Sequence, residues 1–243
     1  MAFRITTQSA CAKTMAEDDA NIWGRLSLPS FRYSILDPKH NIPYITAIQD
    51  RSACASEKPL AASHGHLVWD AALVLADYMQ QVYSKSTDLS CCRAVELGAG
   101  IGLVGMVLSA LGCMEVTLTD QPYCLPLLDK NVDANFGPAA PRPLVKALQW
   151  GEDATDVSQV DLIVASDVLY NASVFAALVH TLDALVTPAT HIFLCYEPRI
   201  PAQEALFFSM LQAAGFTWQP VDFVCTQVDY PDDMVLVRAT KVG

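Results

Sequence analysis

The sequence predicts an α/β protein in which helices cover both faces of a parallel sheet. Strand-like and helix-like segments alternate from residue 93 onward, which is typical of a parallel sheet. A glycine-rich turn joins the first of these strands to its helix. Of the 243 residues, 52% are hydrophobic and only 17% are charged, which is enough to build one substantial core. We therefore expect one compact domain with a short N-terminal addition.

The N-terminal addition is expected to have two parts. Its first residues are small and polar, so we expect a flexible terminus. Two β-like runs follow at about 31–36 and 42–48, and the turn-forming residues 37–41 separate them, which predicts a hairpin. The expected boundaries are 1–20 for the flexible terminus, 21–60 for the N-terminal β extension and 61–243 for the main domain.

The main domain begins with a helix, because residues 70–83 carry apolar side chains at helical spacing. Strands and helices then alternate to the end of the chain. The expected strands cover 92–97, 115–120, 144–150, 160–167, 191–197, 216–224 and 233–240. The expected helices cover 103–111, 125–135, 174–186 and 202–214.

The composition excludes several classes of partner. A net charge of -11 would repel a phosphate backbone, so we expect no nucleic acid partner. The eight cysteines form no C-x-x-C pair and are expected to be reduced and mostly buried. No secretory signal and no run long enough to span a bilayer is recognised, so we expect no membrane association. A cytoplasmic protein that could also enter the nucleus fits these features.

The glycine-rich turn leaves two cofactors open when it is read alone. Glycine is needed where a cofactor approaches the backbone closely or where the turn requires a positive φ. The run from Gly100 to Gly105 satisfies G-x-G-x-x-G, the dinucleotide fingerprint, and Asp120 lies near the distance expected for a ribose-binding acid. Both NAD and S-adenosylmethionine remain compatible with this pattern.

Three further features favour S-adenosylmethionine. Glu96 stands two residues before the first glycine, where its carboxylate could orient the loop and face the positively charged end of the cofactor. Trp69 precedes the loop at the start of a helix. Ser166 and Asp167 end a strand and Tyr170 follows at once, which places an acid and a phenol at the carboxyl end of a sheet, where ligands bind.

Together these motifs give the chain a resemblance to a known family. It resembles the class I protein-lysine methyltransferases of methyltransferase family 16, of the methyltransferase-like 21 type, which modify chaperones, elongation factors and other non-histone proteins. The matching segments, in order, are 65–79, 95–105, 116–122, 148–150 and 167–170. The resemblance covers about 60–200 and implies a Rossmann-like sheet of seven strands. The N-terminal extension and the segment after Arg199 match loosely, and we expect these parts to select the substrate.

The resemblance also assigns roles to residues. It implies S-adenosylmethionine as the cofactor, with Gly98, Ala99 and Gly100 against its methionine part and Asp120 on both ribose hydroxyls. The expected cofactor-binding residues are Trp69, Glu96, Gly98, Ala99, Gly100, Asp120, Gln121, Trp150 and Ser166. The expected catalytic residues are Asp167 and Tyr170, and the expected substrate-binding residues are Tyr196, Glu197 and Arg199. No metal is expected, because no cluster of acids accompanies His64 and His66. The roles of these two histidines stay open.

The expected reaction is methyl transfer from S-adenosylmethionine to the ε-amine of a lysine in a soluble chaperone or translation factor. Because lysine has a pKa of roughly 10.4, its amine must lose a proton and be oriented for in-line attack. Asp167 and Tyr170 could hold the nitrogen, while desolvation helps the proton to leave. A protein substrate is the expected partner of a monomeric enzyme.

Three alternatives remain open. The first is methylation of a small molecule or of another protein nucleophile, since a fold and a cofactor do not fix the acceptor. The second is a cofactor-binding interaction module without activity. The third is a dinucleotide-dependent oxidoreductase.

Overall fold

The structure of the protein is a computed structural model. It describes residues 22–51, 64–83, 89–138, 140–152, 154, 157, 160–227 and 233–242. The terminus expected to be flexible, residues 1–20, lies outside these ranges.

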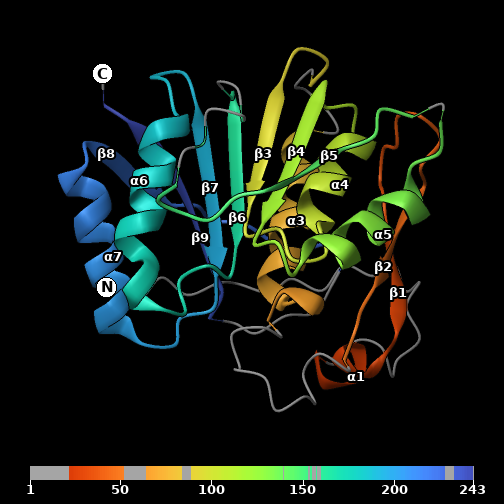
Figure 1. The fold of residues 1–243 in the computed structure, drawn as a ribbon, viewed down its shortest axis with the longest axis horizontal. Coiled ribbons are helices and arrows are strands. Elements are labelled where there is room, and N and C mark those ends of the chain that lie inside the picture. The colour runs from red at the N-terminus through yellow and green to blue at the C-terminus, as the bar shows by residue number, and fades with distance from the viewer. Residues whose placement is uncertain are drawn as a thin grey trace.

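A seven-stranded sheet forms the centre of the protein, in the order β5-β4-β3-β6-β7-β9-β8 (Figure 1). Its strands are β3 (Arg93–Leu97), β4 (Glu115–Asp120), β5 (Leu144–Ala147), β6 (Leu162–Ser166), β7 (His191–Tyr196), β8 (Phe216–Pro220) and β9 (Val235–Lys241). The predicted α/β class is confirmed, because the five strands from β3 to β7 run parallel. The last two strands differ, since β9 pairs antiparallel with both β7 and β8. A parallel connection needs a crossover, usually a helix, and the described residues after β8, 221–227, form none.

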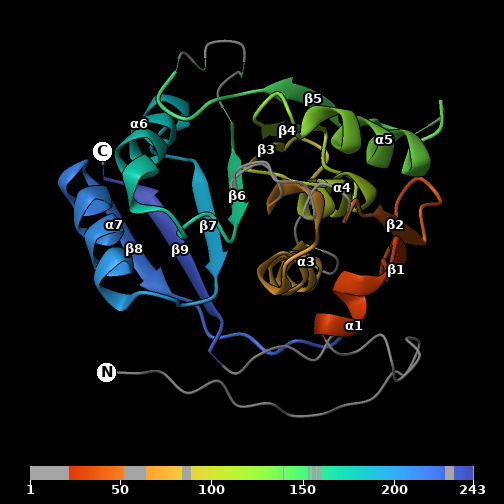
Figure 2. The ribbon, with the colours of Figure 1, turned by 60° about the horizontal axis from the view of Figure 1, so that its bottom comes forward.

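Helices cover both faces of this sheet, as expected (Figure 2). They are α3 (Asp70–Tyr83), α4 (Leu103–Ala110), α5 (Leu125–Asn135), α6 (Phe175–Leu185) and α7 (Pro201–Ala213). The helices α6 and α7 pack on one face and α3 and α4 on the other. Neighbouring strand residues divide between the two cores: Ala94 belongs to the α3 and α4 side, and Val95 to the α6 and α7 side. This division follows from the alternation of side chains along a strand and explains why successive residues of β6 and β7 are apolar.

The predicted N-terminal hairpin is present as β1 (Ser30–Ser34) and β2 (Tyr44–Ile48), which pair antiparallel. His40 and Asn41 adopt φ values of 54° and 57° within the predicted turn, a conformation that asparagine tolerates better than most residues. A short helix that the sequence pattern did not indicate, α1 (Ile22–Ser27), precedes the hairpin.

Two asparagine side chains of α5 attach this hairpin to the main domain. Asn135 accepts a hydrogen bond from Thr46 N at 2.7 Å and donates to Thr46 O at 2.9 Å. Asn131 does the same with the backbone of Ile48, at 2.7 and 3.0 Å. The spacings match, because four helical residues rise about 6 Å and two strand residues about 6.6 Å. The free edge of β2 is therefore paired by side chains as it would be by another strand.

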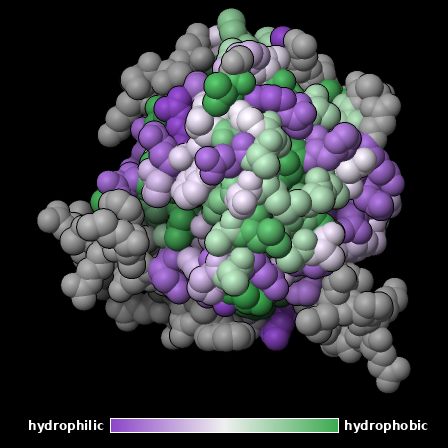
Figure 3. All heavy atoms as spheres, turned by 90° about the vertical axis from the view of Figure 1, so that its left-hand side faces the viewer, coloured by the Kyte–Doolittle hydropathy of each residue, from purple (hydrophilic) through white to green (hydrophobic). Residues whose placement is uncertain are grey.

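Apolar side chains gather on the face that Figure 3 shows, on the side where α6, α7 and β8 lie. Leu206 of α7 and Trp218 of β8 are both exposed. On the inner side, Phe207 and Phe208 pack into the core. Apolar residues thus occur on both sides of α7, so its sequence pattern alone does not show which side is buried.

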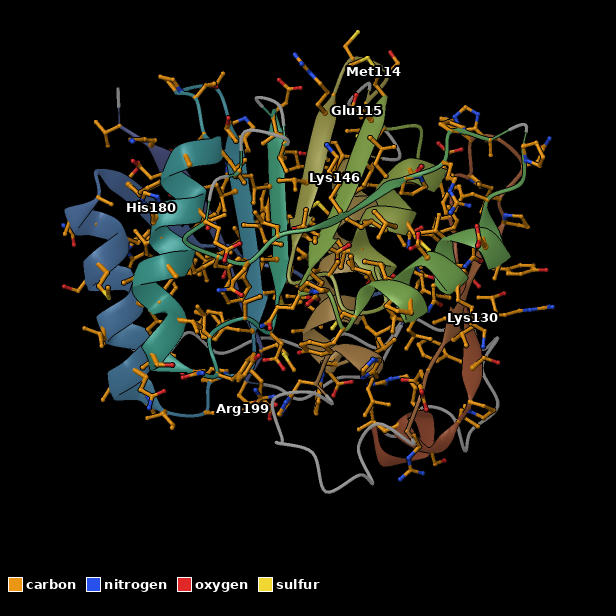
Figure 4. The ribbon with its side chains drawn as sticks, in the orientation of Figure 1. Met114, Glu115, Lys130, Lys146, His180 and Arg199 are labelled. Carbon is orange, nitrogen blue, oxygen red and sulfur yellow. The ribbon has the colours of Figure 1, made fainter. Side chains whose placement is uncertain are left out.

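The topology places a crevice at one end of the sheet. The chain passes from β3 to β4 and β5 on one side, and then to β6 on the other side of β3. At such a switch point the connections leave in opposite directions, and ligands bind at the carboxyl ends of the strands. Arg199 lies at this end, whereas Met114 and Glu115, where β4 begins, lie at the opposite end (Figure 4).

Candidate active site

A cleft of about 990 Å³ lies at the carboxyl ends of β3, β4 and β6. It is lined by most of the residues that the sequence singled out. These are Trp69, Gly98, Ala99, Gly100, Asp120, Gln121, Trp150, Ser166, Asp167, Tyr170 and Arg199. Glu96, Tyr196 and Glu197 are not among the residues that line it.

The glycine loop forms the floor of the cleft between β3 and α4. Gly98 has a φ of 63°, and a Cβ atom there would lie only 3.1 Å from the indole of Trp150 and from Val168. Gly100 has a φ of 56°, and its amide donates to Asp120 Oδ2 at 2.7 Å. Glycine is thus required both for the backbone conformation and for the close approach of neighbouring groups. The backbone of the loop is left open to a ligand in the cleft.

Asp120 ends β4 and holds the glycine loop in place. Besides Gly100 N, it accepts a hydrogen bond from Gln121 N through Oδ1 at 2.7 Å. Asp120 does not cap the next helix, α5, because the N-cap residue of α5 is Cys124. Each carboxylate oxygen has two lone pairs, so Asp120 can still accept hydrogen bonds from a ligand.

Glu96 lies beneath the glycine loop and not in the cleft, which corrects the expectation of a direct cofactor contact. It is fully buried, and its Oε2 accepts a hydrogen bond from Gly105 N at 2.7 Å. The N-cap residue of α4 is Gly102, which has no side chain, so Glu96 pairs an amide of the first helical turn in its place. Burial raises the pKa of Glu96 to about 8, with Gly105 N opposing this rise and Asp120 adding to it.

An aromatic wall forms one side of the cleft. The ring of His64 stacks on Tyr170 with centroids 5.3 Å apart, and on Trp69 at 6.2 Å. Trp69 Nε1 donates to His64 O at 3.0 Å, which fixes the indole. Sequence reasoning assigned no role to His64, since its contact with Tyr170 joins residues far apart in the chain. Its position five residues before Trp69 was the one available signal.

Asp167 directly follows β6 and has a backbone φ of 55°. Such a conformation is uncommon for a residue other than glycine and is often found at functional sites. Its side chain is 9% exposed and accepts a hydrogen bond from Arg199 Nη2 at 2.9 Å. Asp167 does not cap the short 3-10 helix Ala172–Val174 that follows. Asn171 caps it, because its side chain accepts a hydrogen bond from Ser173 N at 3.1 Å.

Tyr170 lies three residues further on and is 42% exposed. Burial raises the pKa of Tyr170, and the carboxylates of Asp120 and Asp167 raise it further. The phenol therefore stays protonated at neutral pH and can donate or accept a hydrogen bond.

Two residues expected to bind substrate lie elsewhere. Tyr196, at the end of β7, is buried and packs against Phe208 of α7 with ring centroids 6.0 Å apart. Its side chain belongs to the core on the α6 and α7 side, so the prediction of a substrate contact is wrong for this residue. Glu197 is joined to the cleft only through Arg199, whose Nη2 donates to Glu197 Oε2 at 3.1 Å.

Within the described ranges, no three or more histidine, cysteine, aspartate or glutamate side chains are grouped so that they could hold a metal ion. Five of the described cysteines carry free thiols: Cys91, Cys92, Cys113, Cys124 and Cys195. Among the same residues, no helix has the length and apolar character needed to cross a membrane.

A mostly parallel sheet with a glycine loop after β3, an acid at the end of β4 and another directly after β6 is the arrangement of a class I methyltransferase that uses S-adenosylmethionine. The model of a family described as Lysine methyltransferase matches residues 49–214. The chain belongs to this family, it is a methyltransferase, and its cofactor is S-adenosylmethionine.

Curated relatives and solved structures agree with this membership. The chain is 40% identical over 178 residues to protein N-lysine methyltransferase METTL21A of Mus musculus, over 72% of this chain and 77% of that protein. It is 41% identical over 133 residues to EEF1A lysine methyltransferase 3 of Xenopus tropicalis, over 54% and 57%. The glycopeptide N-methyltransferase MtfA, solved with S-adenosylmethionine, is similar with a TM-score of 0.55 and 15% identity, over 69% and 94%. At that identity the last likeness concerns the fold alone.

Proposed function

We propose that this protein transfers a methyl group from S-adenosylmethionine to the ε-amine of a lysine in another protein. The observation that carries the proposal is that Asp167 and Tyr170 line the same cleft as the glycine loop. A cofactor site and an acidic, aromatic acceptor site therefore meet in one cavity.

The residues of the cleft fit S-adenosylmethionine. Gly98 and Gly100 line the cleft with partly exposed backbone, and a Cβ atom at either position would crowd the neighbouring protein atoms. We assign Asp120 to the ribose hydroxyls, since its oxygens retain acceptor capacity, and Trp150 to the adenine. When bound, S-adenosylmethionine supplies a methyl group carried by a positively charged sulfur.

Asp120→Ala is expected to weaken the affinity for S-adenosylmethionine by about tenfold to a hundredfold, because hydrogen bonds to a charged acceptor are lost. Titration calorimetry measures this change directly. Asp120→Asn, which keeps an oxygen for Gly100 N, separates the loss of charge from loosening of the loop. Equal affinity of the wild type and Asp120→Ala would show that the ribose assignment is wrong.

The chemistry requires the acceptor nitrogen to be held in line and without its extra proton. The carboxylate of Asp167 attracts the lysine head group, and the phenol of Tyr170 offers a second hydrogen bond. The carboxylate alone would favour the charged ammonium. The aromatic wall of Trp69, His64 and Tyr170 opposes this by removing water from the lysine side chain, which lowers its pKa.

The names of two relatives support a translation factor as the target. Two relatives are named as lysine methyltransferases of EEF1A, from Xenopus tropicalis and Mus musculus. We take a translation elongation factor as the first candidate substrate. A monomeric enzyme of the cytoplasm or nucleus remains our proposal from the sequence.

The proposed function can be tested by incubating the purified protein with methyl-labelled S-adenosylmethionine and a cell lysate. Label is expected on a protein band and, after acid hydrolysis, in methylated lysine. Asp167→Asn is expected to remove this label. Asp161→Asn is a matched control, because Asp161 directly precedes β6 whereas Asp167 directly follows it. Saturable binding of the cofactor without any transfer of label would reject the proposal, and label on another amino acid would redirect it.

A further inference from the structure

Arg199 places a positive charge beside the carboxylate that we assign to the acceptor lysine. Its Nη2 donates to Asp167 Oδ2 at 2.9 Å and to Glu197 Oε2 at 3.1 Å. Its Cζ lies 5.8 Å from the centre of the Trp69 ring, within the usual range of a cation–π contact. A cation therefore already sits where an acidic group meets the aromatic wall.

The charges of this group are not balanced. Two carboxylates, Asp167 and Glu197, face one guanidinium, so the group of three carries a net negative charge. Burial alone would lower the pKa of Arg199, but Asp167 and Glu197 outweigh it and raise the pKa, so the guanidinium stays charged. One further cation would give each of the two carboxylates its own ion-pair partner.

The side chain of Arg199 can move while its backbone stays fixed. Glu204, in the first turn of α7, accepts hydrogen bonds from Arg199 N at 2.8 Å and from Ile200 N at 3.1 Å. These bonds hold the loop onto the helix. The Arg199 side chain is 36% exposed, and Glu197, which is 35% exposed, offers it a second partner besides the more buried Asp167.

We propose that Arg199 is a positioning residue whose ion pair with Asp167 is replaced when the acceptor binds. The incoming ammonium pairs with Asp167, and the guanidinium of Arg199 keeps its ion pair with Glu197. This inference rests on the proposed function, in which Asp167 receives the lysine. Arg199 and the acceptor compete for one carboxylate, so Arg199 weakens acceptor binding. Glu197 strengthens acceptor binding, because it stabilises Arg199 after the exchange. The acceptor site therefore admits an amine in its charged form.

The exchange can be tested with n-butylammonium, a mimic of the lysine head group, added to the full chain saturated with S-adenosylhomocysteine. Nuclear magnetic resonance titration gives the dissociation constant near pH 7.5. Arg199→Gln, which removes the competitor, is expected to bind the probe about threefold to tenfold more tightly than the wild type. Glu197→Gln is expected to bind it more weakly, and the double variant should behave like Arg199→Gln alone. A merely structural role for Arg199 would produce neither the tighter binding nor this coupling.

Two further variants complete the design. Arg199→Lys keeps the charge and should retain an affinity close to that of the wild type. Arg142→Gln removes an exposed ion pair outside the cleft, between Arg142 and Asp133 of α5, and should leave binding unchanged. Equal or weaker binding by Arg199→Gln, or an effect of Glu197→Gln that persists without Arg199, would overturn the proposal. If Arg199→Gln does not fold, unchanged or tighter binding by Glu197→Gln overturns it instead. Binding of n-butylammonium requires no methyl transfer. A failure of the proposed function would therefore appear separately, as the absence of label in the lysate experiment.

Discussion

Asparagine in place of Asp167 is expected to lower kcat for lysine methylation by about two to three orders of magnitude. The affinity for S-adenosylmethionine should stay within about twofold, because we assign Asp167 to the acceptor and not to the cofactor. Asparagine is the right replacement, since it has the same shape and tolerates the φ of 55° at this position, where alanine would be strained. The measurement is steady-state kinetics on the protein target, with calorimetry for the cofactor.

Asp161→Asn provides the control for this variant. Asp161 accepts a hydrogen bond from Arg93 N at 2.8 Å, outside the cleft, so its replacement should leave kcat within about twofold. An Asp167→Asn enzyme that keeps most of its kcat would show that the carboxylate does not hold the acceptor.

Glu96→Gln is expected to change how the stability of the fold depends on pH. The pKa of Glu96 is raised from its usual 4.5 to about 8 by burial. Below pH 4.5 both the folded and the unfolded chain carry the proton, and its stabilising contribution is complete. Between pH 4.5 and 8 only the folded chain keeps the proton, so this contribution shrinks as the pH rises and is lost above 8. The contribution of Glu96 to the free energy of unfolding that is lost between these two pH values is roughly 3–6 kcal/mol.

Denaturant unfolding at pH 5 and pH 8.5 measures the effect. The wild type should lose several kcal/mol more than Glu96→Gln between these two values, because the amide still accepts from Gly105 N but does not titrate. Glu115→Gln, at an exposed position where β4 begins, is the matched control and should follow the wild type. Parallel curves for the wild type and Glu96→Gln would mean that Glu96 is charged in the folded protein at neutral pH.

The sequence predicted the regular elements well where local signals mark their ends. The bounds of α3, β4 and α5 agree with the expected ranges. The strand expected over 144–150 ends at Ala147, and the next three residues line the cleft instead. The antiparallel insertion of β9 between β7 and β8 was beyond local reasoning, since it depends on the route of the chain.

The candidate site shows the same limit. Asp120 and Asp167 could be found because each lies at or directly after the end of a strand, and parallel strands end together at one edge. Tyr196 also ends a strand, but the direction of its side chain depends on which helix covers that face. The stacking of His64 on Tyr170 needed the folded chain, because it joins two loops that are distant in sequence.

The two asparagines of α5 have a consequence for how the hairpin can vary. Side chains and backbone groups of β2 alternate in direction, so a slip by one residue would turn the paired groups of Thr46 and Ile48 away from Asn135 and Asn131. All four hydrogen bonds would be lost together. Single-residue insertions or deletions in β2 should therefore be tolerated poorly, whereas changes of two residues could restore the match. The alignment of the hairpin along α5 can therefore change only in steps of two residues.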